Sequence, residues 1–121
     1  MITRKARLAA AGLALGTAVS LVGMAGTAHA RSTTVEANSN IRAAATTNSR
    51  LVGTTKGVSE AHVYCFTRGQ YVKVGNYGTN VWYHVNVFDN AANPPHAYLR
   101  VYVWGGNVNV GADPAPGIPP C

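Results

Sequence analysis

Alternating apolar and polar positions dominate the second half of the chain. Between residues 80 and 87, three valines and a tyrosine occupy the odd positions and Asn, Trp and His occupy the even ones. A period of two is the pattern of a half-buried β-strand. The same pattern predicts strands over residues 61–66 and 96–104, and no segment after residue 30 shows a helical period. We therefore expect an all-β domain.

Shorter apolar segments extend this pattern. Residues 40–43, 51–53 and 71–74 predict further short strands, separated by Gly, Asn, Asp and Pro. Five or six short strands in a domain of this size favour a small closed β-barrel, because closure removes exposed sheet edges. A sandwich of the immunoglobulin type would need more strands.

The two flanks of the predicted domain, residues 39–104, differ from it in composition. Residues 31–38 are polar and aperiodic, which predicts a flexible arm. Residues 105–121 are rich in Gly and Pro, and their four prolines exclude a central strand. We expect this tail to be extended. All ten aromatic residues lie between Tyr64 and Trp104, so the core should be built mainly from the second half.

Residues 1–30 have the features of a secretory signal peptide. Arg4, Lys5 and Arg7 form a positive start, an uncharged stretch follows, and Ala28-His29-Ala30 ends the segment with small residues at both recognition positions. A membrane anchor is the alternative, but a stretch so rich in Ala and Gly suits a spanning helix less well. We expect cleavage after Ala30 and an extracellular protein.

Export changes the charge of the chain. Three of the ten basic residues lie in residues 1–30, so seven basic and four acidic residues remain, a formal net charge of +3. The seven form no run or stripe, which disfavours nucleic acid as a partner. A modest positive charge suits an anionic cell wall.

Cys65 and Cys121 are the only cysteines. In an oxidising compartment two such cysteines most simply pair with each other. A metal pair, a catalytic thiol and an intermolecular bridge are the alternatives. A disulfide closing so long a loop would stabilise the fold by roughly 4 kcal/mol, which matters in a domain with a small core.

The order of short motifs resembles the bacterial SH3-like (SH3b) domains, in particular the small secreted type of actinobacteria. The motifs are Asn40-Ile41-Arg42, Leu51-Val52-Gly53, Lys56-Gly57, Val63-Tyr64-Cys65, Tyr77-Gly78-Thr79, Trp82-Tyr83-His84-Val85 and Tyr102-Val103. The chain departs from the family at Ala43-Ala44-Ala45-Thr46 and at Leu99-Arg100. The resemblance implies a β-barrel module without catalysis that binds cell-wall peptide or glycan.

Residues suited to catalysis or metal binding are few and scattered. Only four carboxylates follow residue 30, and they lie in separate segments, which disfavours a general acid–base pair. Cys65 with His84 or His96 could form a thiol–imidazole pair, but a disulfide would consume the thiol. His62, His84 and His96 lack the spacing of a zinc site. We expect no enzymatic activity, no cofactor and no metal.

An aromatic face is the main candidate for binding. Along the strands, several aromatic and polar residues share the phase opposite to the aliphatic one. If the aliphatic side chains fill a barrel, these residues face outward and could contact a sugar or peptide. The candidate binding residues are Trp82, His84, Tyr98, Arg100, Tyr102 and Trp104. Alternatively, the rings cover one end of the barrel or pack under the tail.

The predicted function is that of a secreted, monomeric, non-enzymatic binding module that recognises peptidoglycan, as cell-wall peptide or glycan, or an extracellular peptide. The alternative is a small secreted effector, either a bacteriocin-like toxin or a protease inhibitor. An inhibitor needs a rigid exposed loop, and residues 88–95 are the candidate.

Overall fold

The computed structural model of the protein describes residues 30–121, so residues 1–29 of the expected signal peptide lie outside the described part of the chain. Within it, no helix is long and apolar enough to span a membrane. The elements are β1 (Arg31–Val35), β2 (Asn40–Arg42), β3 (Leu51–Thr54), β4 (Ser59–Val74), β5 (Tyr77–Asp89), β6 (His96–Trp104) and the short 3-10 helix η2 (Gly105–Asn107).

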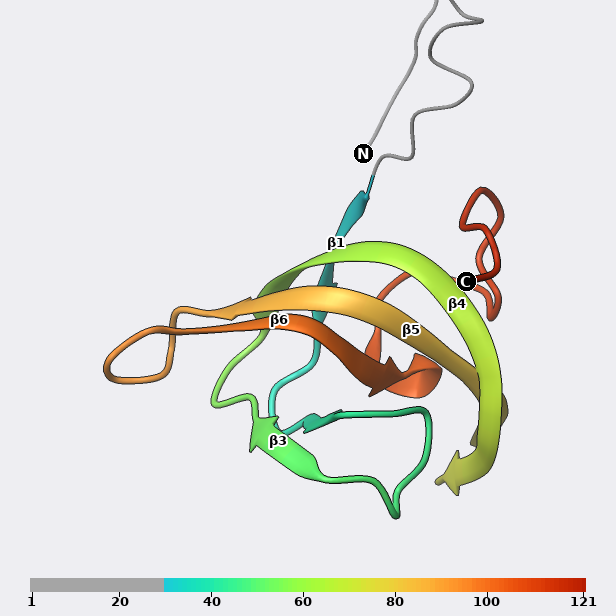
Figure 1. Cartoon of the computed structure of the whole chain (residues 1–121), viewed down its shortest axis with the longest axis horizontal. Coiled ribbons are helices and arrows are strands. Elements are labelled where there is room, and N and C mark those ends of the chain that lie inside the picture. Colours follow the sequence, from blue (N-terminus) through green and yellow to red (C-terminus); the bar gives the residue numbers. More distant parts are fainter. Residues whose placement is uncertain (1–29) are drawn as a thin grey trace, which may run out of the picture.

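All six strands form one antiparallel sheet, in the order β1-β4-β5-β6-β2-β3. Strands β4, β5 and β6 arch over the molecule, and the β2–β3 pair lies below them (Figure 1). The all-β expectation is confirmed. The expected closed barrel is not, because β1 and β3 stand at opposite ends of the strand order and do not pair.

Two of the strands are much longer than expected. β4 has 16 residues and β5 has 13. β4 joins the predicted strands 61–66 and 71–74 into one element, and its register to β5 shifts twice along the way. Such irregularities bend a strand without ending it, which is why a sequence pattern interrupted by Gly69 still forms one curved strand.

The first irregularity in β4 is a bulge at Tyr64. Val63 pairs with Val85, and Cys65 already pairs with the next residue of β5, His84. The bulge reverses the phase of the strand beyond it. Cys65 therefore lies beside His84 on the outer face, whereas Phe66 packs against the core. Simple alternation had placed Cys65 with Val63 and Phe66 on the other face.

A second bulge interrupts β6. Val85 pairs with Val101 and Val87 pairs with Tyr98, so Leu99 and Arg100 together lie opposite Asn86. Arg100 has a φ of 56°, in the left-handed region that side chains other than Gly rarely adopt. The bulge turns Tyr98 toward the core and leaves Leu99 exposed, the reverse of the expected phases.

The core lies on one face of the curved sheet. It contains the odd-numbered valines and Tyr83 of β5, as the alternation predicted, and residues from both flanks of the chain. Its members are Val35, Ile41, Ala61, Val63, Val81, Tyr83, Val85, Val87, Val101, Val103, Val108, Val110, Ala115 and Ile118. The Gly/Pro-rich tail thus supplies four core side chains.

The start of the described chain is ordered in the sheet. Residues 31–38, which we expected to form a flexible arm, contain strand β1, which pairs with β4 from Arg31 opposite Val63 to Val35 opposite Ser59. On its other side β1 pairs with the tail at Val35 and Val108. Pairing on both edges stabilises a segment whose own sequence has no strand pattern.

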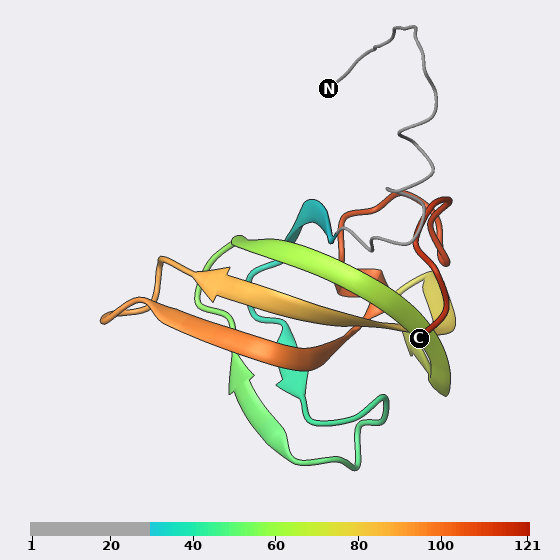
Figure 2. The same ribbon diagram turned by 45° about the horizontal axis from the view of Figure 1, so that its top comes forward.

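The tail runs back along this edge and ends at a disulfide. Cys121 is bonded to Cys65, as predicted from the sequence, at a separation of 56 residues. Backbone hydrogen bonds support the bond on either side, from Phe66 N–H to the Pro119 oxygen (3.0 Å) and from Cys121 N–H to the Phe66 oxygen (2.9 Å). Figure 2 shows the C-terminus meeting the bend of β4.

Tyr83 anchors the middle of the tail from inside the core. Its hydroxyl donates to the Asp113 carboxylate (2.7 Å) and accepts from the Ala115 N–H (3.1 Å). Burial and the neighbouring Asp113 raise the pKa of Tyr83. The hydroxyl therefore stays protonated and keeps both hydrogen bonds at neutral pH.

Candidate functional site

Trp82 and Trp104 do not form the exposed platform that the sequence suggested. They lie opposite each other in the β5–β6 pairing, and their side chains are only 2% and 7% exposed. Each indole N–H donates to a backbone oxygen, Trp82 to Gln70 (2.9 Å) and Trp104 to Thr79 (3.0 Å). The polar atom of each ring is thus already satisfied within the fold, so a ligand can meet only carbon atoms here.

The cover over Trp82 is built around Gln70, near the end of β4. The Gln70 side-chain oxygen accepts from the Thr46 hydroxyl (2.8 Å) and from the N–H of Thr47 (2.8 Å), both in the β2–β3 loop. The Gln70 N–H donates to the Ala45 oxygen (3.0 Å). At Gly69 a Cβ would lie 2.2 Å from that same oxygen, so only glycine permits this close approach.

This cover leaves a groove open beside the two tryptophans. Its volume is about 290 Å³, at the small end of ligand-binding pockets. Side chains from β2 and the turn before it, the β2–β3 loop, the end of β4, and η2 surround it. The lining residues are Asn38, Asn40, Arg42, Thr47, Val72, Val74, Trp82, Trp104 and Asn107.

Two asparagines give the groove unused hydrogen-bonding capacity. The backbones of both are fixed, because the Asn38 N–H donates to the Thr55 oxygen (2.8 Å) and the Asn107 oxygen accepts from the Glu36 N–H (3.0 Å). Their side-chain amides have no hydrogen-bond partner within residues 30–121. By contrast, Asn40 accepts a hydrogen bond from Thr54. Each unpartnered amide offers both donors and an acceptor to a ligand.

The groove carries one charged side chain. Arg42 donates through Nη1 to the Ser49 oxygen (3.0 Å), which orients its guanidinium and leaves its other donors available. None of the lining residues is acidic. The groove therefore suits a neutral or anionic ligand and disfavours a cationic one.

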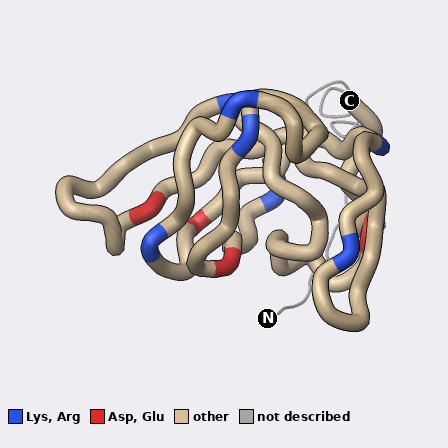
Figure 3. The backbone as a smooth tube through the Cα atoms, turned by 90° about the horizontal axis from the view of Figure 1, so that it is seen from below, with Lys and Arg blue, Asp and Glu red and all other residues tan. Residues whose placement is uncertain are grey.

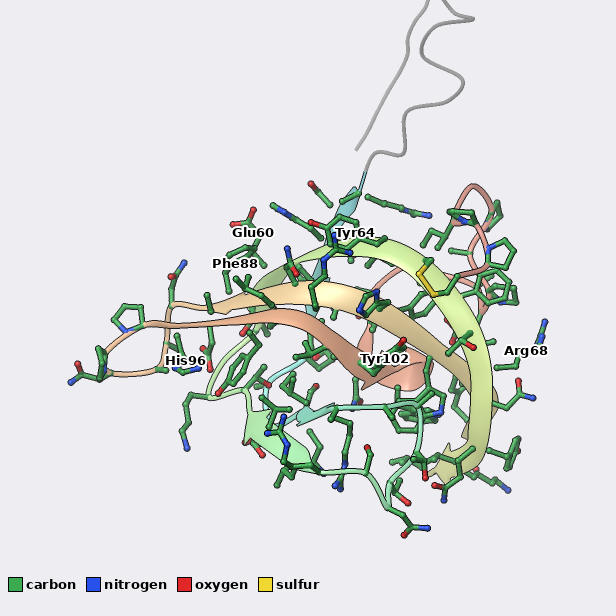
Figure 4. The ribbon with its side chains drawn as sticks, viewed as in Figure 1. Glu60, Tyr64, Arg68, Phe88, His96 and Tyr102 are labelled. Atoms are coloured by element: carbon green, nitrogen blue, oxygen red, sulfur yellow. A yellow bond between two sulfur atoms is a disulfide. The ribbon has the colours of Figure 1, made fainter. Side chains whose placement is uncertain are left out.

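A second cluster continues from the tryptophans along the outer face of β5 and β6. His84 and Tyr102 pair across the strands and stack, with ring centroids 4.8 Å apart. Arg42 of β2 pairs with Tyr102 of β6 and so lies next to this stack. Because residues two apart in a strand share a face, Trp82 and Trp104 belong to the same row. Figure 4 shows Tyr102 on β6 and the yellow disulfide bond at β4.

Arg100 belongs to a closed set of contacts at the far end of this face. The backbone N–H of Arg100 donates to the Asn86 side-chain oxygen (2.8 Å), and the Asn86 side-chain amide donates to the Tyr64 hydroxyl (2.9 Å). The Arg100 guanidinium lies 4.5 Å from the centre of the Tyr64 ring. Tyr64, labelled in Figure 4, is the bulged residue of β4.

Tyr98 is the predicted site residue that lies apart from the others. It packs against the core on the opposite face, and a Cβ at Gly53 would lie 2.5 Å from its hydroxyl oxygen. The structure thus divides the six predicted binding residues. Trp82 and Trp104 form the floor of the groove, His84, Arg100 and Tyr102 lie on the outer face, and Tyr98 is part of the packing.

The arginine and lysine side chains of the described residues have no acidic partners. Within residues 30–121, the one ion pair joins His62 to Glu60 (3.0 Å), and no arginine or lysine lies within 4.0 Å of a carboxylate oxygen. Instead Asp89 accepts from the N–H groups of Lys56 (2.6 Å) and Ala91 (3.1 Å). Figure 3 shows the charged positions spread over several segments rather than gathered in one run. Unpaired cations favour an anionic partner.

The histidines considered as ligands or bases lie in three different surroundings. His62 contacts Phe88, His84 stacks on Tyr102, and His96 packs against Tyr98. His84 Nδ1 lies 4.0 Å from Cys65 Sγ, but that sulfur is bonded to Cys121. No group of three potential metal ligands occurs in the described part of the chain.

Comparisons with protein-family models, curated proteins and solved structures gave no match to this chain.

Proposed function

We propose that the protein is a secreted, non-enzymatic module that binds a glycan of the cell wall in the groove beside Trp82 and Trp104. One observation carries the proposal. Asn38 and Asn107 have fixed backbones and unpartnered side-chain amides, and both line a groove whose two tryptophans present only carbon atoms. Apolar surface with a few convergent polar groups is the usual composition of a small-molecule site.

The strand pairing around the groove favours a glycan over an extended peptide. Extended peptides commonly bind by adding a strand to a free sheet edge. β2, which lines the groove, already lies between β6 and β3. Recognition in the groove must therefore come mainly from side chains, and amides with a guanidinium suit the hydroxyl and acetamido groups of a sugar.

Secretion is part of the proposal. The segment before Arg31 has the pattern of a signal peptide, and the Cys65–Cys121 disulfide suits an oxidising compartment. Cleavage after Ala30 would leave strand β1 whole, since β1 begins at Arg31.

Co-sedimentation with washed, peptide-free cell-wall glycan tests the proposed function. The wild-type protein should pellet with the glycan. Asn38→Gly and Asn107→Ala should pellet less, because each removes one amide from the groove. Asn38 has a φ of 61°, which glycine adopts readily, so this variant should keep the fold. Asn90→Ala, in the distant β5–β6 loop, is the matched control. Equal pelleting of all four proteins would refute the groove as the site.

A protease inhibitor is the second candidate, favoured by the β5–β6 loop. This loop projects from the body of the molecule (Figures 1 and 2). The buried Asp89 holds its base through the N–H groups of Lys56 and Ala91, while residues 93–97 are exposed. Inhibition of an extracellular protease that disappears when residues 91–95 are replaced by a Gly/Ser linker would support this candidate. Slow cleavage within the loop without inhibition would exclude it.

A further inference from the structure

We propose that Arg100 binds a carboxylate, and that the glycan held in the groove is therefore an acidic one. This inference rests on the proposed function and names the class of glycan. Its basis is the combination of an unusual backbone conformation, a guanidinium that lies over an aromatic ring and an unpaired charge, on the face that leads away from the groove.

The backbone at Arg100 is held in a costly conformation by specific contacts. A φ of 56° is unfavourable for an arginine, and such residues persist where their surroundings fix them. Here the Asn86 side chain accepts the Arg100 N–H and donates to Tyr64, whose ring lies under the guanidinium. Asn86 thus holds the Arg100 backbone, and the Tyr64 ring orients the exposed guanidinium before any ligand arrives, which lowers the entropy cost of binding.

The guanidinium N–H groups of Arg100 have no hydrogen-bond acceptor within residues 30–121. Tyr64 contacts it through its ring, and Arg100 makes no salt bridge with a carboxylate. Glu60, on the same strand as Tyr64, pairs with His62 instead. A planar guanidinium with free N–H groups matches the two oxygens of a carboxylate.

Trp104, which lines the groove, and Arg100 lie on the same face of β6. Trp104 and Arg100 are four residues apart, roughly 13 Å at 3.3 Å per residue. Between them stand Tyr102 and its stacked partner His84, and Arg42 lies next to Tyr102. A glycan that leaves the groove along β6 would pass these side chains and reach the guanidinium, whose ligand would be a carboxylate on a neighbouring sugar.

Calorimetric titration with two forms of one glycan tests this inference. The probes are peptide-free peptidoglycan strands, whose muramic acid residues carry a carboxylate, and the same strands with that carboxylate converted to a carboxamide. The wild-type protein should bind the acidic form about three- to ten-fold more tightly than the amidated form. Arg100→Gly should bind both forms with the Kd that the wild type shows for the amidated one. Glycine suits the local φ, so a thermal melt should show the variant folded.

Arg50→Gln is the matched control, because it removes one exposed positive charge elsewhere and should keep the preference for the acidic form. The inference is refuted if the wild type does not discriminate between the two forms or if Arg100→Gly still discriminates. It is also refuted if Arg50→Gln loses as much of the preference for the acidic form as Arg100→Gly does. If the wild type binds both forms equally, the proposed function survives and only the carboxylate site fails. If it binds neither, or binds only an acidic stem peptide, both fail.

Discussion

Trp82 and Trp104 lie directly opposite each other on β5 and β6, and both indole N–H groups donate to backbone oxygens of the β4–β5 hairpin. The pair joins that hairpin to the sheet and at the same time forms the floor of the groove. Stability and the shape of the groove therefore depend on the same two side chains.

Trp82→Ala should destabilise the protein by roughly 3–5 kcal/mol, the usual cost of removing a buried large aromatic side chain. The ring is 2% exposed, so the loss leaves a cavity and an unpaired Gln70 oxygen. Tyr102→Ala on the outer face should cost about 1 kcal/mol, the scale of one cross-strand pair. Denaturant titration of both variants measures the difference. Equal, small effects would mean that the indole is not part of the packed structure.

The disulfide should be formed in the secreted protein and should dominate the stability of the tail. A thiol assay on unreduced, denatured monomer should find no free thiol. Replacing both cysteines by serine should lower the free energy of unfolding by roughly 4 kcal/mol, the value expected for a loop of this length. Two titratable thiols would instead reopen the possibility of a reactive Cys65 beside His84.

Tyr83 should make the protein sensitive to alkali. Burial raises its pKa above the usual value of 10.0, and the hydrogen bond to Asp113 raises it further. An unfolded chain therefore loses this proton at lower pH than the folded protein. The stabilisation is complete below pH 10 and falls as the pH rises above it. Unfolding curves between pH 8 and 11 should show this loss.

Tyr83→Phe supplies the control for the alkaline effect. It should lower stability by roughly 1–3 kcal/mol at neutral pH, because the Ala115 N–H loses its partner and Asp113 loses one of its two tyrosine donors. Its decline above pH 10 should be shallower than that of the wild type. Parallel declines would assign the alkaline sensitivity to other tyrosines, among them Tyr77, whose pKa the hydrogen bond to Asp113 also raises.

The exported protein should begin at Arg31. Intact-mass measurement of protein from culture medium should give the mass of residues 31–121 with one disulfide. Removal of a further five residues should weaken the fold, because β1 would be lost and both β4 and the tail would lose a partner. A secreted form that retains residues 1–30 would contradict the expected cleavage.

Local alternation predicted the strands well where side chains decide the pairing. β6 has the predicted bounds, His96 to Trp104, and the odd-numbered residues of β5 fill the core as expected. Strand β1 could not be predicted this way, because its polar residues are held by backbone pairing to β4 and the tail. The same holds for the tail, whose spaced Val, Ala and Ile side chains reach the core from a Gly/Pro-rich segment.

The candidate site was predicted only in part. Two bulges determine which face its residues occupy, and a contact between segments distant in sequence covers Trp82. The bulges at Tyr64 and at Leu99-Arg100 change which face each later residue occupies. The burial of Trp82 depends on Gln70, which joins the hairpin to a loop more than 20 residues away in sequence. Asn38 and Asn107 lie in polar segments whose sequence gives no sign that their amides meet at one groove.

The central claim is that the groove binds a cell-wall sugar through Asn38 and Asn107. Calorimetric titration of chitin tetrasaccharide, a neutral glycan that places no carboxylate near Arg100, into wild type, Asn38→Gly/Asn107→Ala and Asn90→Ala tests it most directly. We predict measurable binding to wild type and to Asn90→Ala, and at least a ten-fold higher Kd for the double variant at an unchanged melting temperature. Unaltered binding by the double variant, or no binding by the wild type, would contradict the account.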